Sequence, residues 1–113
     1  MKRFKVIWTK NAEFDLELII EHIKISSIEI AKNIFTEIKQ ECNNLHTLPK
    51  RKRVVPELQA IGIDKYREII YKRWRIVYKI DNEKVYVLIV ADSSRNLEDI
   101  LFQRLIKSDN KTE

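Results

Sequence analysis

Glycine is nearly absent from this chain, which carries only Gly62 among its 113 residues. Phosphate-binding loops and dinucleotide-binding motifs need several glycines close together, so the sequence excludes both. The single cysteine, Cys42, excludes an internal disulfide framework. Cys42 and His46 have the spacing of one helical turn, but two ligands do not make a zinc site. We therefore predict no metal and no cofactor.

Long apolar runs are missing as well. The longest, Val85–Ala91, is far shorter than the roughly 20 residues that a membrane-spanning helix requires. The basic start of the chain is not followed by an apolar stretch of signal-peptide length. We expect a cytoplasmic protein without a membrane segment, made of a single domain over residues 1–107 and a polar tail over 108–113.

The positive charge is concentrated in one segment. The net charge is +5, yet residues 1–49 sum to zero and residues 81–113 sum to −2. Residues 50–80 hold ten lysines and arginines against three acidic residues, a net charge of +7. Such a concentration predicts a surface that binds a polyanion or an acidic protein.

The first half of the chain predicts two helices. Residues 12–23 and 31–45 carry apolar side chains at helical spacing, with charged residues between them. Thr9 or Asn11 can cap the first helix, and Ser26 with Glu29 forms a capping-box sequence for the second. Because only two or three residues separate the helices, we expect an antiparallel hairpin.

The second half predicts three successive strands, at about 66–72, 74–80 and 84–92, and Phe4–Trp8 predicts another strand at the N-terminus. In the strand at 74–80, Trp74, Ile76, Tyr78 and Ile80 share one face, and Arg75, Val77 and Lys79 share the other. The strand at 84–92 is apolar on both faces, which favours an interior position in the sheet.

The connections are less regular. Residues 49–65 have no clean period and predict an ordered loop. Asp81-Asn82-Glu83 suits a tight turn, whereas Lys72-Arg73 lacks the glycine or asparagine of two-residue hairpins, so we expect a bulge or a looser loop there. A short last helix follows, capped by Asn96. The predicted fold is α+β: an N-terminal strand and an antiparallel helical hairpin packed on a largely antiparallel sheet, with a short C-terminal helix.

Several segments together carry a resemblance to a known family. They are Arg53–Leu58 (RVVPEL), Tyr66–Ile70 (YREII), Trp74–Tyr78 (WRIVY), the apolar strand ending at Ala91-Asp92, and Arg95 just beyond it. In this order, and over nearly the whole chain, they resemble the RelE/ParE toxin superfamily of bacterial type II toxin–antitoxin systems. The Pro-Glu-Leu segment and the spacing from Arg67 to Trp74 are more similar to the ParE branch. The chain has Lys72-Arg73 and Trp74 where the family usually has a glycine and a tyrosine.

The resemblance to the ParE branch implies a toxin that inhibits its target, DNA gyrase, by binding rather than by catalysis. It also implies a cognate antitoxin, acidic and partly disordered when free, that neutralises the toxin in a hetero-oligomer. We predict that seven residues contact the partner or the target: Arg53, Arg67, Arg73, Trp74, Arg75, Lys79 and Arg95.

Resemblance to the RelE branch implies an alternative function, a ribosome-dependent endoribonuclease that cuts mRNA. Arg75, Arg95 and Lys52 would then bind the phosphate, but the tyrosine or histidine that this branch carries near its C-terminus is missing. This absence favours binding over catalysis. Strand arginines such as Arg67 and Arg75 also have a structural explanation, because they can stack on aromatic rings or pair with Glu57 and Glu68. A third possibility, a small nucleic-acid-binding module, is supported by charge alone.

Overall fold

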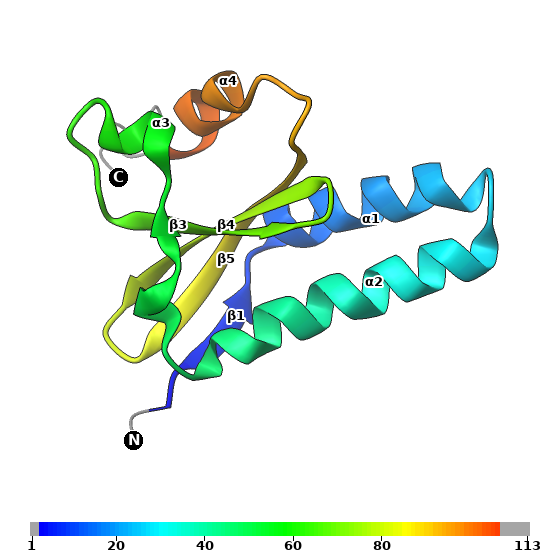
Figure 1. The fold of residues 1–113 in the computed structure, drawn as a ribbon, viewed down its shortest axis with the longest axis horizontal. Coiled ribbons are helices and arrows are strands. Elements are labelled where there is room, and N and C mark those ends of the chain that lie inside the picture. Colours follow the sequence, from blue (N-terminus) through cyan, green and yellow to red (C-terminus); the bar gives the residue numbers. More distant parts are fainter. Residues whose placement is uncertain (1–2, 107–113) are drawn as a thin grey trace.

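A five-stranded sheet forms the centre of the molecule in a computed structural model, which describes residues 3–106 (Figure 1). The strand order is β1-β5-β4-β3-β2, and β1 is parallel to β5 while every other neighbouring pair is antiparallel. The strands are β1 (Lys5–Trp8), β2 (Arg53–Val54), β3 (Tyr66–Tyr71), β4 (Trp74–Asp81) and β5 (Lys84–Asp92). This arrangement confirms the predicted α+β fold and the interior position of β5. The predicted tail over residues 108–113 lies outside the described residues.

Two long helices, α1 (Lys10–Lys24) and α2 (Ile28–Asn43), form the predicted antiparallel hairpin and cover one face of the sheet (Figure 1). The side chain of Thr9 accepts a hydrogen bond from the Ala12 amide and caps α1. Helix α2 begins one residue later than predicted, because Ser27 and not Ser26 is its cap. Glu29 therefore lies at the second helical position, and the predicted capping box does not form. Neither helix is long and apolar enough to cross a membrane, and the same holds for every other helix among the described residues.

The larger hydrophobic core lies between this hairpin and the sheet. Ile76 and Tyr78 of β4 point into it, as the predicted alternation requires, while Val77 points to the opposite face. The helices contribute Ala12, Leu16, Ile34, Ile38 and Cys42, and β5 contributes Val85, Val87 and Val90.

A second core covers the other face of the sheet. There, α3 (Pro56–Gln59), α4 (Leu97–Leu101) and the π-helical turn Phe102–Ile106 pack over Val77 and Ile89. The expectation of an irregular loop over residues 49–65 is therefore wrong in part, since this segment contains a 3-10 turn, β2 and α3. Strand β2 has only two residues and forms by pairing with β3. Two residues are too few to show the alternation of apolar and polar side chains by which a strand is predicted. The predicted cap of the last helix is confirmed, because Asn96 accepts a hydrogen bond from the Asp99 amide.

The turn between β3 and β4 is tighter than expected. Tyr71 pairs directly with Trp74, so Lys72 and Arg73 form a two-residue turn, with Lys72 in the left-handed region at φ 53°. Contacts to α2 compensate for the missing glycine, because Glu37 accepts hydrogen bonds from the Tyr71 hydroxyl and the Lys72 ammonium group at 2.5 and 3.1 Å. The register irregularity of the sheet lies elsewhere, between Val77 and Tyr78. The tight turn predicted between β4 and β5 is confirmed, with Asn82 at φ 59°.

Candidate functional site

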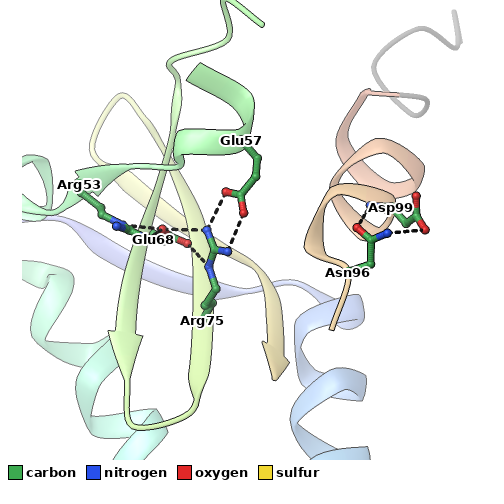
Figure 2. Close-up of polar contacts among 6 residues, drawn as sticks. All are labelled: Arg53, Glu57, Glu68, Arg75, Asn96 and Asp99. Carbon is green, nitrogen blue, oxygen red and sulfur yellow. Dashed lines mark hydrogen bonds and ion pairs between the residues drawn. The ribbon is translucent and has the colours of Figure 1, made fainter. Parts of the chain in front are cut away.

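Two of the predicted arginines, Arg53 and Arg75, belong to an ion-pair network on the face of the sheet opposite the helical hairpin (Figure 2). Arg75 donates to both oxygens of Glu57 at 2.8 Å and to both oxygens of Glu68 at 2.8 and 3.0 Å. Arg53 donates to Glu68 at 2.6 Å from the other side. The network contains two positive and two negative charges, so it is electrically balanced.

This network engages most of the hydrogen-bonding capacity of Arg75. Four of the five N–H groups of a guanidinium have acceptors here, and the Arg75 side chain is only 12% exposed. The hydrogen bonds that Arg75 donates to Glu57 raise the pKa of Arg75 and lower the pKa of Glu57. Both groups are therefore charged at neutral pH, and an incoming phosphate would have to displace a carboxylate.

Three other predicted residues, Arg73, Trp74 and Arg95, converge where β4 begins, beside the end of β5. Together with α1 they line a cleft of ≈ 280 Å³, which we call the arginine cleft. Its remaining lining residues are Asp15, Leu18, Ile19, His22, Ile23, Val90, Ala91 and Asp92. In the sequence Arg95 lies on a different segment from the adjacent Arg73 and Trp74, and the sheet brings them together because the β3–β4 turn lies beside the end of β5.

Hydrogen bonds hold the two turns of the arginine cleft together. The Arg73 guanidinium donates to Asp92 at 2.7 Å, and the Arg73 carbonyl accepts from the Ser93 amide at 2.7 Å. Asp92 in turn accepts from the amide and hydroxyl of Ser94, which lowers the pKa of Asp92, with a smaller contribution from Arg73. The Arg95 amide donates to the Asp92 carbonyl at 3.0 Å. The turn that carries Arg95 is thus fixed to the β3–β4 turn.

Asp15, which lines the same cleft, forms a partly buried ion pair with Arg104. Asp15 of α1 binds both terminal nitrogens of Arg104, at 2.7 and 2.5 Å, and accepts from the Val90 amide. The hydrogen bond to Asp15 raises the pKa of Arg104. Sequence reasoning missed this pair, because 89 positions separate its members. One signal in the sequence was the position of Asp15 directly before the apolar Leu16, because an acidic side chain next to the buried face of a helix needs a partner.

The remaining predicted residues lie apart from the arginine cleft. Arg67 donates to the Lys52 carbonyl at 2.6 Å on the β2 side of the sheet. The Lys79 ammonium group lies 5.9 Å from the centre of the Tyr86 ring. The seven predicted contact residues therefore fall into separate groups: Arg53 and Arg75 share the ion-pair network, and Arg73, Trp74 and Arg95 share the arginine cleft.

Several apolar side chains of the helical hairpin are exposed, among them Phe35, although the apolar spacing of the second helix predicts it on the buried face. A second depression, which we call the outer groove, lies between α1 and α2 and is lined by Ile20, Lys24, Ile28, Ala31, Lys32, Phe35 and Thr36. Ile28 is 60% exposed and Phe35 is 43% exposed. In Figure 1 the connected ends of α1 and α2 extend past the sheet.

Solved structures of toxin–antitoxin systems share this fold. The chromosomal ParDE system from P. aeruginosa matches with a TM-score of 0.67 and 15% identity, over 80% of this chain and 96% of that chain. The toxin–antitoxin complex RelBE2 from Mycobacterium tuberculosis matches with a TM-score of 0.53 and 21% identity, over 84% of this chain and 97% of that chain. Both systems therefore contain a chain with this fold.

The family itself follows from the sequence. Residues 6–97 match the family described as the ParE toxin of type II toxin–antitoxin system, parDE, and this chain belongs to that family of toxins. No curated protein is significantly similar to the chain. The predicted superfamily and its ParE branch are thereby confirmed.

Proposed function

We propose that this toxin arrests growth by binding and inhibiting DNA gyrase, without catalysis of its own, in the cytoplasm. Membership of the ParE family supports the choice of target. The observation that carries the choice of binding over catalysis is the engagement of Arg75. Its guanidinium is held by Glu57 and Glu68 and is not free to stabilise a phosphate.

The surroundings of Arg75 support the same choice. A ribonuclease of the RelE type needs a general acid or base beside its phosphate-binding groups. Asn96 and Asp99 lie across from Glu57 (Figure 2). The Asn96 side-chain amide donates a hydrogen bond to the Asp99 carboxylate at the start of α4, so Asp99 is engaged in the cap of that helix and not in a contact with Arg75. Arg95, the second arginine of the ribonuclease alternative, lines the arginine cleft and not the network around Arg75.

We further propose that the cognate antitoxin binds the outer groove with an acidic amphipathic helix. Exposed Ile28 and Phe35 suit the apolar face of such a helix. Lys24 and Lys32 line the same groove, so acidic residues on the incoming helix would find complementary charge. We therefore favour the helical hairpin, where apolar anchors and lysines lie together, over the ion-paired part of the basic segment formed by Arg53, Lys72, Arg73 and Arg75.

Induction of the toxin in growing cells tests the proposed function. We expect growth arrest together with induction of a DNA-damage reporter, while ribosome-bound transcripts stay intact. Co-expression of the antitoxin should restore growth. Cleavage of transcripts at the onset of arrest, without the DNA-damage response, would establish the ribonuclease alternative.

The antitoxin proposal is tested by substitution in the outer groove. Phe35→Gln should weaken antitoxin binding at least tenfold, because it removes an exposed apolar anchor. Ile61→Gln is the matched control, since Ile61 is 61% exposed and lies outside the groove. Equal antitoxin affinities for the two variants would contradict this placement.

A further inference from the structure

We infer that the arginine cleft binds a segment of the target protein that presents one carboxylate beside an apolar side chain. This inference rests on the proposed function, in which the toxin acts by binding a protein target. It adds the chemistry of the contact and the residues of the toxin that make it.

The charges lining the cleft indicate a single negative group on the partner. Two acidic residues, Asp15 and Asp92, each already pair with an arginine, at 2.5 Å to Arg104 and 2.7 Å to Arg73. Arg95 is exposed and forms no ion pair within residues 3–106. The lining therefore has one uncompensated guanidinium, which matches one carboxylate.

The same charges disfavour a polyanion at this site. A second negative group on the partner would approach the carboxylates of Asp15 and Asp92, and like charges at short range repel. A nucleic acid backbone would find a better surface at Lys50, Arg51 and Lys52, which are exposed and whose side chains form no ion pair in the described part of the chain. These three cations are not part of the cleft.

Apolar residues make up the rest of the binding surface. Leu18 is 55% exposed at the cleft, Ile19 and Ile23 are half-buried, and Trp74 lines the wall with 7% of its surface exposed. An apolar side chain that enters here would cover Leu18 and contact the indole ring. Interfaces commonly derive their affinity from such an apolar anchor beside a charged hydrogen bond.

The turn that carries Arg95 is already ordered in the unbound protein. Its turn is fixed through Asp92 and Ser93 to Arg73, and the adjacent Lys72 and Tyr71 are fixed to Glu37 of α2. A backbone that is already ordered loses less entropy on association. Glu37 and Asp92 thus act as positioning residues for the contact that Arg95 makes.

Four variants test the inference: Arg95→Gln and Leu18→Gln in the cleft, and Arg51→Gln and Ile61→Gln as matched controls outside it. All four residues are exposed, so folding should be preserved, and thermal unfolding checks this. We expect each cleft variant to bind purified gyrase about tenfold or more weakly and to lose growth arrest. Each control should stay within about twofold of the wild type.

Salt dependence and a conservative variant separate a carboxylate from a polyanion. Arg95→Lys keeps the charge and should retain more affinity than Arg95→Gln. Raising salt from about 50 to about 200 mM should weaken wild-type binding by less than about tenfold, whereas six or more phosphate contacts would cost about a thousandfold. A loss of that size, or a loss confined to Arg51→Gln, would overturn the inference.

The outcomes also separate this inference from the proposed function. If the wild type arrests growth but does not bind gyrase, the proposed target is wrong, and the growth assay still tests the cleft. Cleft variants that arrest growth like the wild type overturn the inference, as do variants that lose only antitoxin binding. A wild type that neither arrests growth nor binds gyrase overturns both.

Discussion

Replacement of Arg75 by methionine removes the cation that Glu57 and Glu68 share. The Glu68 side chain is fully buried, so it would keep only its ion pair with the half-exposed Arg53. Removal of one partner from a buried ion pair costs about 3–5 kcal/mol, because the remaining charge is uncompensated. Since Arg53 remains, we expect the lower end, about 3 kcal/mol, and at roughly 4 °C per kcal/mol a Tm that is lower by about 12 °C.

Chemical denaturation followed by fluorescence of the two tryptophans measures this cost. Arg53→Met is the control, and it should cost less than about 1 kcal/mol because the Arg53 side chain is 56% exposed. Unchanged stability of Arg75→Met at pH 7 would refute a structural role of this guanidinium and leave it available for function.

The effect of Arg75→Met should also depend on pH. Hydrogen bonds from Arg75 lower the pKa of Glu57 below its ordinary value of 4.5, so the folded state holds the carboxylate in its charged form. The stabilisation is therefore complete above that ordinary pKa and is lost as the pH falls through the lower folded-state pKa. The stability difference between wild type and variant should be constant between pH 6 and 8 and should shrink below about pH 4. A difference that grows in acid would contradict this assignment.

Three further substitutions or measurements test other parts of the structure. Arg104→Met should cost about 1–3 kcal/mol in urea denaturation, since it leaves the buried carboxylate of Asp15 with only the Val90 amide, and Arg104→Lys should cost less. Burial raises the pKa of Cys42 to about 12, so at pH 8.5 a thiol reagent should label the native protein roughly a thousandfold more slowly than the urea-unfolded chain, and equal rates would place Cys42 at the surface. Ile38→Ala should cost about 2–5 kcal/mol by thermal unfolding, because Ile38 of α2 is fully buried between the hairpin and the sheet, and a change below about 1 kcal/mol would contradict the packing of α2 on the sheet.

Most of the fold could be predicted because its signals are local. The apolar spacing of the two helices and the alternation around Ile76 and Tyr78 each depend on a few consecutive residues, and both are confirmed. Strand β2 and the tight turn at Lys72 were missed for the opposite reason. The first exists through pairing with β3, and the second is held by Glu37, which is distant in sequence.

The candidate site was less predictable. The sequence indicated which side chains of β4 share a face, and so placed Arg75 away from Trp74. The sequence left two roles open for Arg75, contact with a partner or an ion pair within the chain. The structure shows the ion pairs, because α3 brings Glu57 to Arg75 and β3 brings Glu68. The arginine cleft was not predicted as a unit, because its lining comes from α1, the β3–β4 turn and the end of β5, which are distant in sequence.

Supercoiling by purified gyrase in the presence of this toxin tests the central claim most directly. We predict that the wild type inhibits supercoiling, that added antitoxin restores it, and that Arg95→Gln inhibits at least tenfold less than Arg51→Gln. Undisturbed supercoiling at toxin concentrations that cut mRNA on purified ribosomes would contradict the account.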